Sequence, residues 1–338
     1  MRYTHFKRAD LDVSQMALGT WAIGGAGYGE TEDSESIRAI RTALDNGVNF
    51  IDTARAYGTG HAEKLIGQAI KGYDREKILI ATKCGVMVST LKAIRGAQGH
   101  VRDASFANIL YECEKSLRAL DVDYIDVLYL HWPDFDTPLQ ETAEAFNTLK
   151  KQGKIRFVGV SNFTADQIEE LDKYCQVDVI QQPFSMIVKN DVEIMKWAKE
   201  KGIDTFTYGA LGSGILSGKY RTLPQFGEKD PRSTGFYPYF KEPYFSKVML
   251  LVNELDKIAE EVNRPVNEVT LNWTVRNDFV SSTLCGVRTS EQAKANTSAF
   301  DWALTDEQFE RINKAIEQYI DFDGSTSKQL RPRSASER

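Results

Sequence analysis

Short apolar runs rich in β-branched residues alternate with longer segments in which apolar residues recur at helical spacing. Strand followed by helix followed by strand, repeated in this way, predicts parallel pairing of the strands. The predicted strands are residues 15–20, 50–54, 78–83, 125–131, 157–161, 179–182, 205–210 and 283–287. The predicted helices between them are residues 34–46, 62–71, 106–119, 139–151, 165–174 and 192–201.

This alternation fits two architectures, an open doubly wound sheet and a closed barrel. The count of eight strands favours closure. The first strand-to-helix junction also lacks a tight GxGxxG turn, because its glycines lie on a long loop that could equally be a simple connection. These glycines are Gly24, Gly25, Gly27 and Gly29. We therefore expect an α/β fold of the (β/α)₈ TIM-barrel type.

The C-terminal third departs from the regular rhythm. Residues 219–245 are rich in aromatic residues, glycine and proline, and in a barrel this segment follows the seventh strand on the face that carries active sites. An inert surface insertion is the alternative. An amphipathic helix over residues 307–318 precedes a polar C-terminus, so we expect one domain over residues 1–320 and a flexible tail over 321–338.

Composition narrows the range of partners. The 338 residues carry a formal net charge of −6, and there is no long basic stripe for nucleic acid or an anionic membrane. The N-terminus has no leader-like apolar core, and no apolar stretch is long enough to span a bilayer, so we expect a cytoplasmic protein.

Cysteines and histidines are too dispersed to suggest a metal site. The four cysteines form no CxxC pair, and four histidines are few for a metal-dependent barrel hydrolase. We therefore expect neither a metal nor a disulfide. The residues are Cys84, Cys113, Cys175, Cys285, His5, His61, His100 and His131.

Ionisable residues stand at the ends of three predicted strands. Asp52, Lys83 and His131 each follow an apolar run, and Tyr57 lies close behind the first of them. Each could be structural: an aspartate bonded to a loop, a lysine reaching solvent, a core histidine. Together at one barrel mouth they can transfer a proton to a carbonyl oxygen. A lysine ammonium beside the phenol favours the phenolate, an aspartate holds the lysine, and a neutral histidine orients the substrate oxygen.

These residues lie in motifs that resemble the aldo-keto reductase family, in particular its bacterial members of the inositol-catabolism and general stress types. LDVSQMALGTW (11–21) resembles the opening hairpin and first strand of the family, and FIDTARAYGTGHAEKLIG (50–67) resembles its signature region. The resemblance implies that Asp52, Tyr57, Lys83 of ATKCG and His131 of LYLHWPD are catalytic. It also implies a (β/α)₈ barrel with an N-terminal β-hairpin and an extra C-terminal helix.

The resemblance extends to a nicotinamide cofactor. It implies that Ser161, Asn162 and Gln181 hold the carboxamide, and that Phe184 stands where the family has a stacking tyrosine. Further motifs resemble the pyrophosphate loop and the segment that grips the adenosine end. Their residues are Leu211, Gly212, Ser213, Arg288, Gln292 and Asn296.

Arg288 suits a 2′-phosphate, so NADPH is expected over NADH, although NADH is possible. Ala295 replaces a glutamate of the family and leaves that preference open.

The expected function is hydride transfer between NADPH and the carbonyl or alcohol of a small aldehyde, ketone or sugar, with no nucleic-acid or membrane partner. Trp21 and Trp132 are expected to wall the substrate pocket with residues 85–102, unless they are core aromatics. The alternative function is a nicotinamide-binding regulatory subunit with slow turnover, resembling the β-subunits of potassium channels. The physiological substrate and the oligomeric state stay open.

Overall fold

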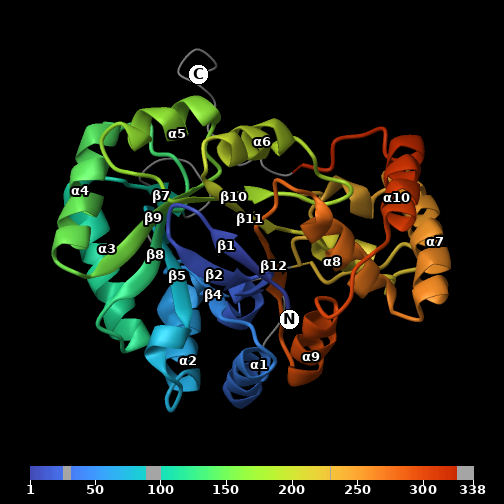
Figure 1. The fold of residues 1–338 in the computed structure, drawn as a ribbon, viewed down its shortest axis with the longest axis horizontal. Coiled ribbons are helices and arrows are strands. Elements are labelled where there is room, and N and C mark those ends of the chain that lie inside the picture. The colour runs from blue at the N-terminus through green and yellow to red at the C-terminus, as the bar shows by residue number, and fades with distance from the viewer. Residues whose placement is uncertain (26–31, 89–99, 229, 326–338) are drawn as a thin grey trace.

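Eight parallel strands form a closed barrel, and helices surround it (Figure 1). The computed structural model describes residues 1–25, 32–88, 100–228 and 230–325. The strands are β3 (Met16–Gly19), β4 (Phe50–Asp52), β5 (Leu79–Cys84), β8 (Ile125–Leu130), β9 (Ile155–Ser161), β10 (Val179–Pro183), β11 (Asp204–Tyr208) and β12 (Ser282–Gly286). They pair in this order, and β12 closes the barrel by pairing with β3. The predicted (β/α)₈ fold is confirmed.

All eight predicted strands and all six predicted helices are present, with boundaries within two residues of the prediction. The helices are α1 (Asp33–Asp45), α2 (His61–Ala69), α3 (Phe106–Leu120), α4 (Leu139–Lys151), α5 (Ala165–Asp172), α6 (Val192–Glu200), α7 (Tyr244–Val262), α8 (Val266–Arg276), α9 (Ser290–Ser298) and α10 (Asp306–Tyr319). Single 3-10 turns are η1 (Trp21–Gly24), η2 (Tyr57–Gly60), η3 (Arg75–Lys77), η4 (Gly212–Ser217) and η5 (Pro238–Phe240). The helix predicted near the C-terminus is α10.

The helices α7, α8 and α9 and the antiparallel pair β6 (Val86–Val88) and β7 (His100–Arg102) were not predicted. For α8 the physical reason is clear. Thr270, Asn272 and Thr274 are buried along with its apolar residues. A helix buried on nearly every side does not show the one-sided apolar stripe from which helices are recognised.

The chain begins with an antiparallel hairpin of β1 (Tyr3–Phe6) and β2 (Leu11–Ser14), which confirms the expected N-terminal hairpin. It lies at the centre of the view in Figure 1. Phe6 packs on Phe206 with ring centroids 5.1 Å apart, and Phe206 packs on Phe50 at 4.3 Å inside the barrel. Phe50 begins its strand, so the hairpin plugs the N-terminal end of the barrel and the site is built at the other end.

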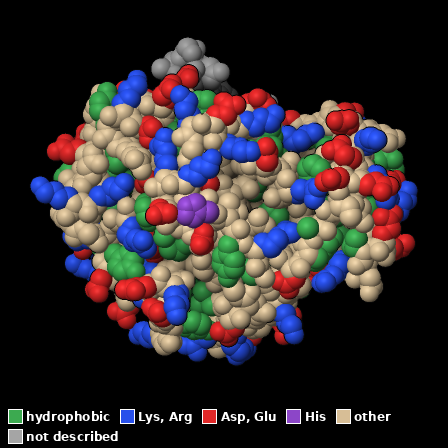
Figure 2. All heavy atoms as spheres, in the orientation of Figure 1, with side chains coloured by type: hydrophobic (Ala, Val, Ile, Leu, Met, Phe, Trp, Pro, Cys, Tyr) green, Lys and Arg blue, Asp and Glu red, His purple; other side chains and the backbone are tan. Residues whose placement is uncertain are grey.

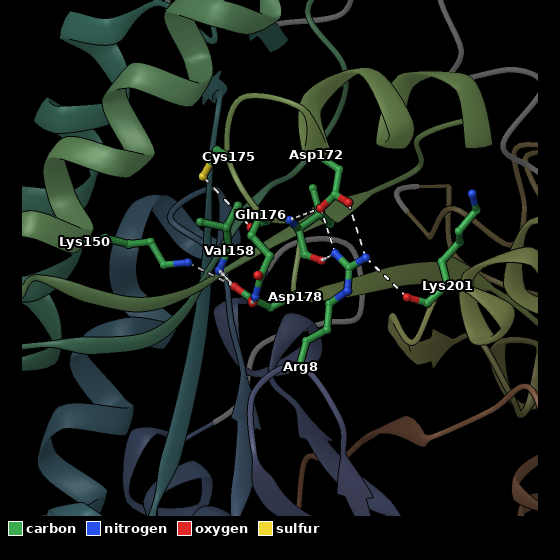
Figure 3. A network of polar contacts seen from close by, with 9 residues as sticks. Arg8, Lys150, Val158, Asp172, Cys175, Gln176, Asp178 and Lys201 are labelled. Atoms are coloured by element: carbon green, nitrogen blue, oxygen red, sulfur yellow. Dashed lines mark hydrogen bonds and ion pairs between the residues drawn. The ribbon is translucent and has the colours of Figure 1, made fainter.

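Polar contacts fix this hairpin to the surrounding helices (Figure 3). Arg8 donates from Nη1 to Asp172 Oδ1 (2.7 Å) and to the carbonyl oxygen of Val177 (2.6 Å). Its Nη2 donates to Asp172 Oδ2 and to the carbonyl oxygen of Lys201, both at 3.3 Å. One guanidinium therefore joins the hairpin to the C-terminal ends of α5 and α6.

The aromatic segment over residues 219–245 packs into a cluster of its own. Tyr220, Phe226 and Phe240 meet edge to face with centroids 5.1–5.9 Å apart, and η5 contacts α7. The segment is therefore packed against the fold.

The predicted flexible tail starts too early at residue 321. Phe322 packs on Tyr244 at 4.5 Å, and the amide of Gly324 donates to the carbonyl oxygen of Ile187 at 3.1 Å. Residues 321–325 are thus part of the packed structure, because an aromatic ring and a backbone bond hold them. The rest of the predicted tail, 326–338, lies outside the described residues, as do Gly27, Gly29 and residues 89–99.

Charged side chains of both signs are interspersed over the face seen in Figure 2, and hydrophobic side chains form small separate patches there. Among the described residues, no helix has the length and apolar character needed to cross a bilayer.

Candidate active site

Three elements bring the predicted proton-transfer residues together at the C-terminal end of the barrel. Asp52 ends β4, Lys83 lies near the end of the neighbouring β5, and Tyr57 begins η2. The Lys83 Nζ is 2.6 Å from Asp52 Oδ2 and 3.3 Å from the Tyr57 hydroxyl, and it donates to the carbonyl oxygen of Thr53 at 2.8 Å. Lys83 and Asp52 are each only 2% exposed, so the ion pair is shielded from water.

Two aromatic rings flank the phenol. His131 follows β8, and its ring centroid is 6.1 Å from that of Tyr57 at an interplanar angle of 80°. The ring centroid of Trp21, in η1, is 6.4 Å from that of Tyr57 at an interplanar angle of 30°. The structure thus brings together the four residues predicted to transfer a proton and one predicted pocket residue.

The charges of this cluster determine which group carries a proton. Burial alone would lower the pKa of Lys83, but Asp52 and Tyr57 outweigh it and raise that pKa, so the lysine is an ammonium. Burial also raises the pKa of Asp52, and Lys83 opposes that change. At 2.6 Å the pair is best described as carboxylate and ammonium.

The phenol itself differs from the expectation. Burial raises the pKa of Tyr57, and Lys83 offsets only part of that rise. The lysine favours the phenolate as predicted, but desolvation of the anion is the larger effect. Tyr57 therefore holds its proton at neutral pH and is a proton donor in this state.

Tyr129 is a second phenol near Asp52, but it cannot take the same role. Its side chain is fully buried in the barrel interior, where it packs over Gly159. Burial and the Asp52 carboxylate raise its pKa well above the ordinary value. Tyr57, at the rim, is the phenol that a substrate can reach.

The turn that carries Tyr57 packs closely against η1. A Cβ added at Gly24 would lie 2.8 Å from the Tyr57 carbonyl carbon and 3.0 Å from the Gly58 nitrogen, nearer than side chains approach backbone. Gly24, at the start of the predicted glycine-rich loop, is therefore in close backbone contact with the turn that carries Tyr57.

Amide side chains gather beside the ion pair. Ser161 ends β9, and the Asn162 Nδ2 donates to its hydroxyl oxygen (3.0 Å) and to the carbonyl oxygen of His131 (3.1 Å). Gln181 on β10 donates from Nε2 to Asp52 Oδ1 at 2.8 Å. Of the three residues predicted to hold a carboxamide, Asn162 thus contacts His131, Gln181 contacts Asp52, and Ser161 is bonded to Asn162.

Backbone groups and a cation follow the next two strands. Gly212, Ser213 and Gly214 have φ values of 54°, 54° and 95°, so the chain turns tightly just after β11. Arg288 follows β12, and its amide donates to Gln292 Oε1 at 2.8 Å. A tight glycine-containing turn and a guanidinium are the groups that hold pyrophosphate and a ribose phosphate. Leu211, which precedes the turn, is partly buried, and Asn296 donates to the Gly286 carbonyl oxygen at 3.4 Å.

Comparisons with known proteins agree with this geometry. The family model described as Aldo/keto reductase family matches residues 15–317. The chain belongs to this family. The aldo-keto reductase YhdN of Bacillus subtilis (strain 168) is 36% identical over 323 residues, covering 95% of each chain.

Two more distant relatives have named activities. The NADH-specific methylglyoxal reductase of Escherichia coli (strain K12) is 31% identical over 307 residues, covering 88% of this chain and 93% of the relative. The solved structure of the glycerol dehydrogenase AKR11B4 from Gluconobacter oxydans has a TM-score of 0.85 and 32% identity and covers 98% of each chain.

In this aldo-keto reductase, Phe184 does not lie where it was predicted. Its ring is buried and stacks on Trp273 of α8 (5.4 Å), with Phe279 edge-on at 5.2 Å. Side chains alternate along a strand, so Gln181 points into the barrel and a residue three positions later points out. The placement of Phe184 on the cofactor is therefore corrected.

Tyr208 is an aromatic residue beside the predicted carboxamide group that was not among the predicted site residues. It ends β11 two positions after the interior residue Phe206, and its hydroxyl donates to Asn162 Oδ1 at 2.8 Å. It is half-buried at the mouth of the aldo-keto reductase barrel. Alternation counted from Phe206 could have identified it.

The second predicted pocket residue, Trp132, lies next to His131 and under a cation. The Arg102 guanidinium carbon is 4.8 Å from the centroid of the Trp132 ring, and Arg102 Nη1 donates to the carbonyl oxygen of Pro133 at 3.4 Å. The β6–β7 hairpin thus reaches the same rim of the barrel. Within the described residues, no group of three or more His, Cys, Asp or Glu side chains is arranged to hold a metal ion.

Proposed function

We propose that this aldo-keto reductase is a cytoplasmic enzyme that transfers a hydride between NADPH and the carbonyl or alcohol of a small aldehyde, ketone or sugar. One observation carries the proposal. The Tyr57 hydroxyl lies 3.3 Å from a buried lysine that is itself paired with Asp52 at 2.6 Å. The relatives named for methylglyoxal and glycerol support a small polar substrate.

Each residue of the site has a separate role in reduction of the carbonyl group. Nicotinamide, when bound, supplies the hydride to the carbonyl carbon. Tyr57 donates its proton to the carbonyl oxygen, and the Lys83 ammonium stabilises the phenolate that remains. His131 donates a hydrogen bond to the same oxygen and orients it. In alcohol oxidation the phenolate takes the proton back.

The groups at the strand ends fit such a cofactor. Ser161, Asn162 and Gln181 offer amide and hydroxyl groups to a carboxamide beside Asp52. Tyr208, held by Asn162, offers the aromatic face that had been assigned to Phe184. The loop at Leu211, Gly212 and Ser213 would take the pyrophosphate, and Arg288, Gln292 and Asn296 the adenosine end.

The direct test is NADPH and NADH consumption across a panel of aldehydes, ketones and sugars, and reduction of NADP⁺ by the matching alcohols. Tyr57→Phe should bind NADPH as wild type does and lose turnover by about a thousandfold, because it lacks the proton that general acid catalysis requires. A Tyr57→Phe variant with undiminished turnover would sink the assignment. Tight NADPH binding without turnover by wild type would favour the regulatory-subunit alternative.

Cofactor preference has its own test. Arg288→Ser should weaken NADPH binding by about tenfold or more and leave NADH binding nearly unchanged, because only NADPH carries the 2′-phosphate. Dissociation constants from nicotinamide fluorescence at fixed salt measure both. Equal losses for the two cofactors would show that Arg288 does not read the 2′-phosphate.

A further inference from the structure

Arg55 bridges the turn that carries Tyr57. It lies two residues before the phenol, between β4 and η2, and its side chain is three-quarters buried. Nη1 donates to the carbonyl oxygen of Thr59 at 2.8 Å, which closes the turn around Tyr57. The same nitrogen is 3.7 Å from Glu63 Oε2 on α2.

Glu63 connects this turn to the strand that carries the lysine. It is fully buried, and its Oε1 accepts a hydrogen bond from the Thr82 hydroxyl at 2.7 Å. Thr82 is the neighbour of Lys83 on β5. The path from Arg55 through Glu63 to Thr82 therefore joins the two elements whose catalytic atoms are 3.3 Å apart.

Gly60 makes room for the bridge. A Cβ at this position would overlap the Arg55 guanidinium and would lie 3.4 Å from Glu63 Oε2. Gly60 also has a φ of 90°, which side chains other than glycine rarely adopt. The absence of a side chain at Gly60 leaves space for the Arg55–Glu63 ion pair, so the Arg55 guanidinium is a fixed part of this turn.

We propose that Arg55 is a positioning residue that, through Glu63, holds the Tyr57 hydroxyl within reach of Lys83; the inference rests on the function proposed above. Among the described residues, Arg55 makes no hydrogen bond or ion pair with the Tyr57 hydroxyl, Lys83 or Asp52, so it acts through the turn. A displacement of about 1 Å at a reacting group can cost about a hundredfold in rate. A fixed turn therefore matters more to turnover than to binding.

An effect on the position of Tyr57 can be distinguished from an effect of charge because Arg55 and Glu63 carry opposite charges. The charged groups around Tyr57 are Asp52 and Lys83, with His131 as the neighbouring ring, and Glu112 is the other carboxyl group that interacts with Arg55. Arg55→Gln removes a cation and Glu63→Gln removes an anion. Acting through space alone, these changes would shift the pKa of Tyr57 in opposite directions. If they act through position, both changes move the phenol away from Lys83 and raise the pKa of Tyr57.

The experiment compares Arg55→Gln, Glu63→Gln and Arg55→Lys with wild type in the presence of NADP⁺ and an accepted alcohol. We expect kcat to fall about tenfold or more in both Gln variants, with KM and NADPH affinity within about threefold of wild type. The pH at which oxidation is half-maximal should rise in both by about half a unit or more. Arg55→Lys keeps the charge and should recover part of kcat. Arg311→Gln, which breaks an exposed pair with Glu261 between α10 and α7, is the control and should change neither quantity.

Amide hydrogen exchange over residues 53–62, measured without substrate, gives a readout independent of the reaction. Faster exchange in both Gln variants, beside unchanged exchange in the control, is expected. Shifts of opposite sign, or unchanged kcat and exchange in folded variants, would overturn the proposal. If wild type turns over no substrate, the proposed function fails and exchange alone decides the positioning role. If Arg55→Gln does not fold, Glu63→Gln and Arg55→Lys decide it.

Discussion

Glu112 on α3 is a buried carboxyl group next to the strand that carries Lys83. It accepts hydrogen bonds from the amide of Gly85 (2.5 Å) and from Asn108 Nδ2 (3.3 Å). Burial raises its pKa to about 7, and the bond from Gly85 and the nearby Arg55 only partly oppose that change. This group is therefore ionised or neutral depending on pH within the physiological range.

Glu112→Gln should remove a pH dependence of stability. The folded-state pKa lies above that of an unfolded glutamate, so the favourable contribution of Glu112 is fully present below the unfolded pKa and is lost as pH rises through about 7. The glutamine can still accept the Gly85 bond and never ionises. We expect the variant to gain about 1–2 kcal/mol over wild type at pH 8 and little at pH 5, measured by urea unfolding. Destabilisation at pH 8 would mean that the carboxylate is required.

The site residues that could be predicted from the sequence are ionisable residues at the ends of predicted strands. Asp52, Lys83 and His131 each follow an apolar run, and the structure gathers them around Tyr57. Phe184 was misplaced because a motif gives a position in the chain and not the direction in which a side chain points. Arg55 was missed because its partner, Glu63, is a helix residue whose burial no local pattern reveals.

One side chain, Arg8, joins the hairpin β1–β2 to two of the surrounding helices. Arg8→Ala removes bonds to Asp172 and to two carbonyl oxygens and leaves the partly buried Asp172 without its cation. The change should lower the free energy of unfolding by about 1–3 kcal/mol, measured in urea. Because the hairpin lies at the end of the barrel opposite the site, kcat and KM should stay near wild type.

The control for this change is Arg221→Ala, which breaks an exposed pair with Asp256 and should cost less than about 1 kcal/mol. A fall in kcat with unaltered stability in Arg8→Ala would contradict the structural role.

Only some of the helices and strands could be predicted from the sequence. The hairpin β1–β2 was predicted from the resemblance to the family. Helix α8 was not predicted because it is buried on nearly every side, and β6 and β7 are short strands on either side of residues outside the described ranges.

At the scale of the whole molecule, the fold could be predicted because strands and helices alternate regularly along most of the chain. Parallel strands buried on both faces require apolar runs, and each return crossing requires a helix with one apolar stripe. The rhythm weakens after β11, where an aromatic cluster and α7 separate the seventh strand from the eighth. The packed residues 321–325 were not predicted either, because their polar composition gives no sign of the Tyr244 ring that Phe322 meets.

Closure of the barrel by β12 against β3 has a consequence for synthesis on the ribosome. The two strands come from opposite ends of the chain, so a growing polypeptide has an unpaired edge at β3 until residues 282–286 have left the exit tunnel. Open edges invite pairing with other chains. The nascent protein therefore stays exposed to edge-to-edge aggregation until β12 has emerged and paired with β3.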